Sequence, residues 1–178
     1  TDLLVAALND IQASVRITAA RALGRMTVTP ASAISALTAR LQDSSTDVRA
    51  ASASVLGRSR HPGDSAVAAL SEAAEDDDSI VRAAAIYALA SIDLSADNVL
   101  PILAKSLTDH DSAVRGRAIA GLEHLGDAAK SVLPEITAAL NDDAATVRAS
   151  AAATIGSLGE SARTAMPHLT DTLSDADT

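Results

Sequence analysis

The segment from Leu100 to Gly126, LPILAKSLTDHDSAVRGRAIAGLEHLG, contains a pattern that recurs along the whole chain of 178 residues. Its Val-Arg pair returns every 33 residues, at Val15-Arg16, Val48-Arg49, Val81-Arg82, Val114-Arg115 and Val147-Arg148. Aspartates keep the same step at Asp10, Asp43, Asp76, Asp109, Asp142 and Asp175. A fixed period of this length, without insertions, indicates a repeat architecture.

Each unit is expected to contain two helices joined by a short polar turn. In the first helix, Leu100, Leu103 and Leu107 stand at i, i+3 and i+7, which is one helical face. Prolines are expected in the first turn of such helices, at Pro101, Pro134 and Pro167. The second helix begins near the Val-Arg pair and is expected to stop near a glycine, as at Gly24, Gly57 and Gly156. No segment alternates with period two, so no strand is expected.

Two short helices cannot bury their apolar faces alone, so successive pairs must stack into a continuous core. The sequence therefore predicts an all-α solenoid, an α-α superhelix of about 5.5 repeats and eleven helices. We expect one domain over residues 1–178, with an eleventh helix at 165–173. Neither end carries a polar capping repeat, which favours a fragment of a longer protein or self-association through the uncapped ends.

The composition excludes several classes of protein. Tyr87 is the only aromatic residue, so Ala, Leu, Val and Ile must fill the core in thin layers of helices. The absence of cysteine excludes disulfides and thiolate chemistry. No stretch approaches the roughly 20 apolar residues of a membrane span, and no signal peptide opens the chain. We expect a cytoplasmic protein.

The charge balance argues against nucleic acid and anionic membranes as partners. The net charge is −9, with 14 basic residues against 23 acidic ones, and no basic cluster stands out along the chain. The acidic residues are nearly all Asp and the basic ones nearly all Arg. We attribute this Asp-rich and Arg-rich composition to codon bias and to Asp at helix caps, in preference to adaptation to high salt.

The unit L-P-x-L/I-x-x-x-L-x-D-x-x-x-x-V-R-x-x-A, followed by L-G, resembles the HEAT-repeat family. It is similar to the short HEAT-like repeats of phycobilisome lyase subunits. Leu125-Gly126-Asp127-Ala128 and Leu158-Gly159-Glu160-Ser161, each with a Pro eight residues after the Gly, resemble that family's connections. The resemblance implies a HEAT-like solenoid with a concave surface lined by the second helices. It says little about activity, because such repeats serve many functions.

The resemblance also implies a ladder between neighbouring repeats, formed by the turn Asp and the Arg six residues later. The matching positions are Asp10 and Arg16, Asp43 and Arg49, Asp76 and Arg82, Asp109 and Arg115, and Asp142 and Arg148. We expect these residues to be structural, because a catalytic residue would not recur in every repeat. Repeated charge pairs set the register between layers more than they add stability.

One stripe of the second helices is expected to face outward, at positions one before, two after and six after the repeated Val. It is unusually apolar for a solvent face, and exposed apolar stripes mark interaction sites. The residues predicted to bind a partner are Ile17, Arg21, Ile80, Ala83 and Tyr87. Tyrosine is enriched among interface hot spots. The alternative is that Ile80 and Tyr87 pack sideways on the neighbouring repeat.

No metal site is expected. Asp76-Asp77-Asp78 is the densest carboxylate run, but the Gly and Glu of a calcium loop do not follow it, which favours a solvated turn. The histidines lack the spacing of metal ligands; they are His61, His110, His124 and His168.

The sequence favours a scaffold over an enzyme. It has no G-x-S-x-G elbow and no Gly-rich phosphate loop, so we expect neither catalysis nor a cofactor. The favoured function is a scaffold or adaptor that binds a protein. Two alternatives stay open: an enzyme subunit of the HEAT-like bilin lyase type, and a structural spacer within a larger protein. A lyase would need aromatic or cationic groups to position a large conjugated ligand, and this chain has one aromatic residue.

Overall fold

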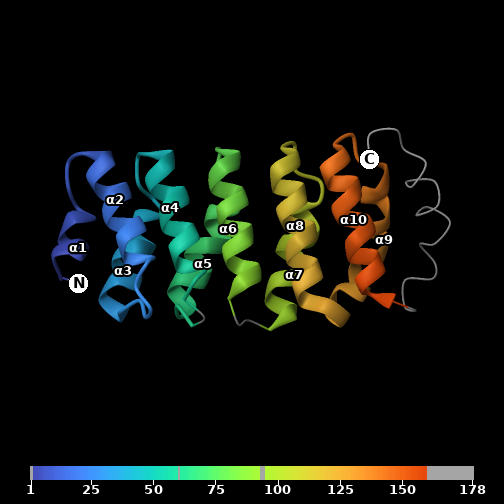
Figure 1. Cartoon of the computed structure of the whole chain (residues 1–178), viewed down its shortest axis with the longest axis horizontal. Coiled ribbons are helices and arrows are strands. Elements are labelled where there is room, and N and C mark those ends of the chain that lie inside the picture. The colour runs from blue at the N-terminus through green and yellow to red at the C-terminus, as the bar shows by residue number, and fades with distance from the viewer. Residues whose placement is uncertain (1, 60, 93–94, 160–178) are drawn as a thin grey trace. The chain divides into compact units, whose positions relative to one another are not determined.

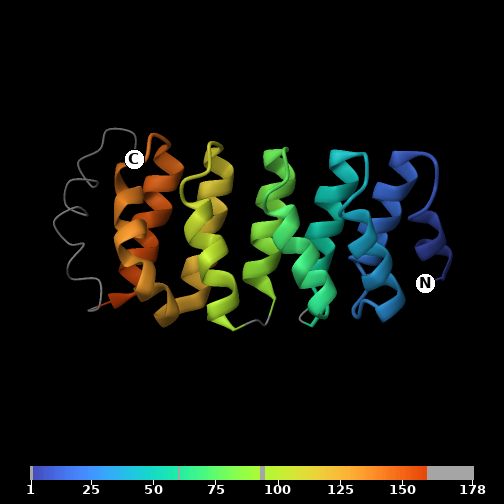
Figure 2. The same ribbon diagram turned by 180° about the vertical axis from the view of Figure 1, so that it is seen from behind.

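The structure, a computed structural model, describes residues 2–59, 61–92 and 95–159 (Figures 1 and 2). Over these ranges it contains ten α-helices, two 3-10 helices and no strand, which confirms the all-α prediction. The number of helices differs from the predicted eleven, and the helix expected at 165–173 lies outside the described residues. The chain divides into two compact units, residues 1–94 and 95–178.

The first unit has six helices in two layers. They are α1 (Asp2–Ala7), α2 (Ala13–Leu23), α3 (Ala31–Arg40), α4 (Thr46–Leu56), α5 (Asp64–Ala73) and α6 (Ser79–Ser91). The second helices of the repeats, α2, α4 and α6, lie side by side in one layer (Figure 1). The first helices, α1, α3 and α5, form the other layer, and α3 and α5 each pack against the second helix of their own repeat.

The second unit repeats this arrangement. Its elements are α7 (Ala96–Ser106), α8 (Ser112–Leu125), the 3-10 helix η1 (Gly126–Val132), α9 (Leu133–Ala138), the 3-10 helix η2 (Ala139–Asn141) and α10 (Ala145–Ser157). Helix α8 packs against both α7 and α10. Pro134 lies in the first turn of α9, as expected, whereas Pro101 lies inside α7, because that helix begins earlier than the proline pattern indicated. Pro167 lies outside the described residues.

The apolar positions that repeat in the sequence form the core. One row comes from the first helices, Leu37, Leu70, Leu103 and Ile136, and is fully buried. Two rows come from the second helices and are buried as well, Val48, Val81, Val114 and Val147, and Leu23, Leu56, Leu89, Leu122 and Ile155. Alanine is the most frequent of the remaining buried residues, so small side chains fill much of the space between the helices.

Glycines set how closely the second helices of the first unit approach one another. Helices α2 and α4 end next to Gly24 and Gly57, as expected, and the φ angles of these glycines, −67° and −63°, are ordinary helical values. Gly156, the third expected stop, lies inside α10. The constraint is space: a Cβ on Gly57 would lie 2.6 Å from the Cα of Ala88, and one on Gly24 would lie 2.7 Å from Cγ2 of Val55. Larger residues at these positions would push α2, α4 and α6 apart.

Candidate partner-binding site

The turns between the helices of each pair are held by a repeated arginine–aspartate contact. Nε of Arg49 donates to Oδ2 of Asp76 at 2.8 Å, and Nη2 donates to Oδ1 at 2.9 Å. The third nitrogen, Nη1, donates to the backbone oxygen of Asp43 at 3.0 Å. The same pair of hydrogen bonds, from Nε and Nη2, joins Arg16 to Asp43 and Arg115 to Asp142. Each guanidinium therefore ties its own turn to the turn of the next repeat.

This geometry differs in one respect from the ladder expected from the resemblance. The Asp six residues before each Arg offers its backbone oxygen, whereas the carboxylate partners of Arg16, Arg49 and Arg115 lie 27 residues later in the next repeat. Arg82 and Arg148 bond the backbone oxygens of Asp76 and Asp142 in the same way. The carboxylates of Asp10 and Asp109 accept backbone N–H groups two residues ahead, which closes their turns.

Ion pairing shifts the titration of these groups. Burial raises the pKa of Asp76, but the hydrogen bonds from Arg49 and from the backbone N–H of Asp78 outweigh it and hold that pKa below its ordinary value. The pKa of Asp43 is lowered in the same way through Arg16. At Asp142 the hydrogen bond from Arg115 is the largest cause of a lowered pKa. These carboxylates are therefore charged in the folded protein at neutral pH.

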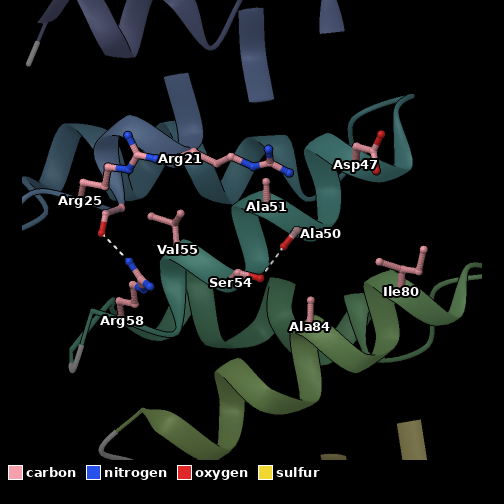
Figure 3. A pocket seen from close by; sticks show the side chains of 11 residues that line it. Arg21, Arg25, Asp47, Ala50, Ala51, Ser54, Val55, Arg58, Ile80 and Ala84 are labelled. Carbon is pink, nitrogen blue, oxygen red and sulfur yellow. Dashed lines mark hydrogen bonds between the residues drawn. The ribbon is translucent and has the colours of Figure 1, made fainter. Parts of the chain in front are cut away.

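A pocket of about 410 Å³ lies on the second helices of the first unit (Figure 3). Arg21 comes from α2 and Arg25 from the turn that follows it. Helix α4 contributes an acidic residue, Asp47, and a floor that includes Ala51 and the buried Val55. The far side is formed by α6, with Ile80 and Ala84, and the turn after α4 contributes Arg58.

The pocket is positively charged at one end. Arg25 and Arg58 lie at that end, Asp47 and Ile80 lie at the other, and the side chain of Arg21 extends along the wall between them (Figure 3). Nη1 of Arg58 donates to the backbone oxygen of Gly24 at 2.9 Å, which holds its guanidinium in place. Within the part of the chain that the structure describes, Arg21 and Arg25 have no hydrogen bond or ion pair from their side chains.

The structure brings only some of the predicted partner-binding residues to this pocket. Arg21 and Ile80 line it, whereas Ile17, Ala83 and Tyr87 lie elsewhere on the second helices. Ile80 is 61% exposed and Tyr87 is 47% exposed, while Ile17 and Ala83 are half-buried.

Arg25 and Arg58 were not among the predicted site residues, because no basic cluster stands out along the sequence. Arg25 follows Arg21 by four residues, and Arg58 follows Arg25 by one repeat. Only the stacking of the helices therefore brings the three arginines together. One signal was present in the sequence. Gly-Arg occurs at Gly24-Arg25 and again one period later at Gly57-Arg58. In later repeats the arginine position holds Ser91, His124 and Ser157.

Neither a metal-binding cluster nor a membrane-spanning helix occurs among the described residues. Over residues 2–59, 61–92 and 95–159, no group of three or more His, Asp or Glu side chains is placed to hold a metal ion. In the carboxylate run, Asp76 pairs with Arg49, and Asp78 caps α6 by accepting from the N–H of Ile80. None of the described helices combines the length and the apolar character needed to cross a membrane.

The repeated pairs, the layered helices and the shared core define an all-α repeat solenoid. The family model for HEAT repeats matches residues 34–123 and 100–178, and that for the PBS lyase HEAT-like repeat matches residues 15–43. The chain therefore belongs to the HEAT-repeat family, as its sequence indicated. No curated protein matches it in sequence.

Solved structures share the fold. A chain in the complex of CpcE and CpcF of phycocyanin lyase from Nostoc sp. PCC7120 is 25% identical, with a TM-score of 0.76, over 89% of this chain and 65% of that one. A designed armadillo repeat protein in complex with the peptide (KR)4 is 18% identical, with a TM-score of 0.67, over 88% and 80% of the two chains. A chain of the S. pombe condensin Cnd3–Cnd2 subcomplex is 19% identical, with a TM-score of 0.77, over 97% and 27%.

Proposed function

We propose that this chain is a protein-binding scaffold and that α2, α4 and α6 present its binding surface. The observation that supports the proposal most strongly is the pocket between these three helices, which combines exposed arginines with the exposed Ile80. Pockets that place a few polar groups around an apolar surface are the usual form of a binding site. Helical repeat proteins commonly bind along such a surface, because stacking extends it from one repeat to the next.

Helix α6 adds an apolar stripe beside the pocket. Ile80, Ala83 and Tyr87 stand at i, i+3 and i+7, so they share one face of the helix. Leaving the large side chains of Ile80 and Tyr87 in water is unfavourable, and a partner that covered them would remove that cost. Tyrosine loses little side-chain entropy on binding for the area it buries, which suits it to anchor a partner.

Site-specific photo-crosslinking tests this proposal. A photo-reactive residue placed at Ala84, in the pocket, should crosslink to a protein in a lysate of the source cells. The same residue placed at Ala68, exposed on the opposite layer in α5, is the matched control. A discrete protein crosslinked from Ala84 and not from Ala68 is the expected result. Crosslinking from Ala68 alone would place the binding surface on the first helices and overturn the proposal.

The likeness to the phycocyanin lyase complex supports a second candidate, an enzyme subunit of the bilin lyase type. A bilin carries carboxylates, which Arg21 and Arg25 could contact. Titrating the protein with a free bilin and recording visible absorbance separates the two candidates. The scaffold proposal expects an unchanged spectrum, whereas a shifted spectrum that Arg21→Gln abolishes would favour the lyase.

We also propose that residues 1–178 form one solenoid that stays monomeric in solution. Self-association of two chains is the alternative. Sedimentation velocity over a hundredfold range of concentration distinguishes them. A mass that stays monomeric supports the proposal, and a concentration-dependent dimer supports self-association.

A further inference from the structure

We propose that the pocket lined by Arg21, Arg25 and Arg58, the arginine pocket, binds an acidic segment of a protein partner. The segment would have two or three Asp or Glu residues next to one aliphatic side chain. This inference rests on the proposed scaffold function and names the chemistry of the partner.

The charge of the arginine pocket is opposite to that of the chain. Three arginines and Asp47 line it, so its formal charge is 3 − 1 = +2, whereas the whole chain carries −9. Three of the 12 arginines of the sequence meet in this one pocket. A local field of opposite sign attracts a complementary partner and repels others, which gives specificity and faster association.

The arginines are available for a ligand. Arg21 and Arg25 are exposed, and neither side chain has a hydrogen bond or ion pair within the described ranges. Arg58 is already held by the backbone oxygen of Gly24 through Nη1, which positions its other nitrogens without further loss of freedom. Guanidinium groups bind carboxylates through two parallel hydrogen bonds, so the end of the pocket that carries Arg25 and Arg58 suits acidic side chains.

The other end of the arginine pocket selects against a continuous polyanion. Ile80 and Asp47 lie there (Figure 3), and Ala84 lines the same α6 side of the pocket as Ile80. An aliphatic side chain can cover Ile80, whereas a second run of negative charges would face the Asp47 carboxylate. Nucleic acid needs many phosphates neutralised at once, and three arginines beside Asp47 do not provide that. A peptide that is acidic at one end and aliphatic at the other fits both ends.

Fluorescence anisotropy with synthetic peptides tests the inference on the whole chain. The probe is a labelled peptide, Gly-Asp-Glu-Asp-Ala-Leu-Ala-Gly. Its matched control has the same length with Asn and Gln in place of Asp and Glu. We expect the acidic probe to bind at least tenfold more tightly at low salt, with the difference falling as salt screens the charges. A second control replaces Leu with Ser and should bind several-fold more weakly.

Three single substitutions in the pocket and one control in the second unit localise the binding. Arg21→Gln and Arg25→Gln should each weaken the acidic probe about fivefold to tenfold, as expected for loss of a charge-assisted hydrogen bond. Lys130→Gln makes the same charge change in the second unit, at a lysine that pairs with Asp127 on the surface, and should leave affinity unchanged. Asp47→Asn should tighten binding about twofold to threefold, an effect that misfolding cannot produce.

Several outcomes would overturn the inference. Equal affinity for the acidic and amide peptides would do so, as would unchanged binding in both arginine variants. A single-stranded oligo-dT probe that bound as tightly as the acidic peptide would assign the pocket to nucleic acid. If the photo-reactive residue placed at Ala84 crosslinks to a neutral or basic segment of a protein, the scaffold function stands and only the proposed specificity for acidic segments is wrong.

Discussion

Arg49 donates two parallel hydrogen bonds to Asp76, from Nε at 2.8 Å and from Nη2 at 2.9 Å, across the boundary between two repeats. The side chains are only 17% and 13% exposed, so water does not replace the contact easily. The same guanidinium bonds the backbone oxygen of Asp43 in its own turn. One arginine thus fixes both the shape of its own turn and the distance from that turn to the turn of the next repeat.

Removing this arginine should destabilise the repeats on both sides. Arg49→Ala removes the guanidinium from the Asp43 carbonyl and from the Asp76 carboxylate, which keeps the backbone N–H of Asp78, so we expect a loss of about 2 kcal/mol in the free energy of unfolding. Urea denaturation followed by circular dichroism measures it. Arg49→Lys should lose part of this, because an ammonium cannot form the two parallel bonds. Unchanged stability in Arg49→Ala would show that the contact contributes nothing.

Stability should fall at acidic pH because of the ladder aspartates. The pKa values of Asp43, Asp76 and Asp142 are lowered in the folded protein, so the folded state binds fewer protons than the unfolded state near pH 4. Their contribution is complete above the unfolded pKa of about 3.9 and is lost as the pH falls through the lower folded values. Thermal unfolding between pH 7 and pH 2 measures the fall.

The variant Arg49→Ala provides the control for this pH dependence. Without the guanidinium, the pKa of Asp76 should move towards its ordinary value, so the stability of the variant should change less between pH 5 and pH 2. Equal acid sensitivity in both proteins would mean that other groups cause the loss.

Two glycines, Gly57 at the end of α4 and Gly116 inside α8, should respond oppositely to the same substitution. Gly57→Ala would place a Cβ 2.6 Å from the Cα of Ala88, so we expect a loss of about 1–3 kcal/mol as α4 and α6 are forced apart. Gly116→Ala meets nothing within 4 Å and lies inside α8, so it should stabilise by up to about 1 kcal/mol. Chemical denaturation of both variants checks the pair. Stabilisation by Gly57→Ala would contradict the close packing of α4 on α6.

The exposed stripe on α6 should contribute to binding. Once crosslinking has identified a partner, Tyr87→Ala and Ile80→Ala should each weaken its binding, with a loss near thirtyfold at a true hot spot. Ile80 is 61% exposed, so Ile80→Ala should change stability by less than about 0.5 kcal/mol. Titration calorimetry measures the affinity.

Ile11→Ala is the matched control for the α6 stripe, because Ile11 is 93% exposed in the turn before α2 and away from the stripe. It should leave affinity unchanged. If Tyr87→Ala lowers the melting temperature but leaves binding intact, Tyr87 is a packing residue.

The sequence by itself determined the fold class and the core. A 33-residue period places the same apolar residue at the same point of every repeat, and Leu70, Leu103 and Ile136 are buried for that reason. Helical periodicity is local, so it can be read along the chain. The family resemblance implied a ladder between neighbouring repeats at positions such as Asp76 and Arg82, and the structure pairs the Asp76 carboxylate with Arg49 of the preceding repeat.

Only the tertiary structure decided the pocket and the spacing of the helices. Arg21, Arg25 and Arg58 meet because α2 and α4 lie side by side, and nothing in the charge of short segments shows that. Gly57 has an ordinary helical φ, so its role depends on Ala88 of the next repeat and not on its own conformation. Lateral contacts between repeats depend on packing distances, and a sequence period fixes their order without fixing their geometry.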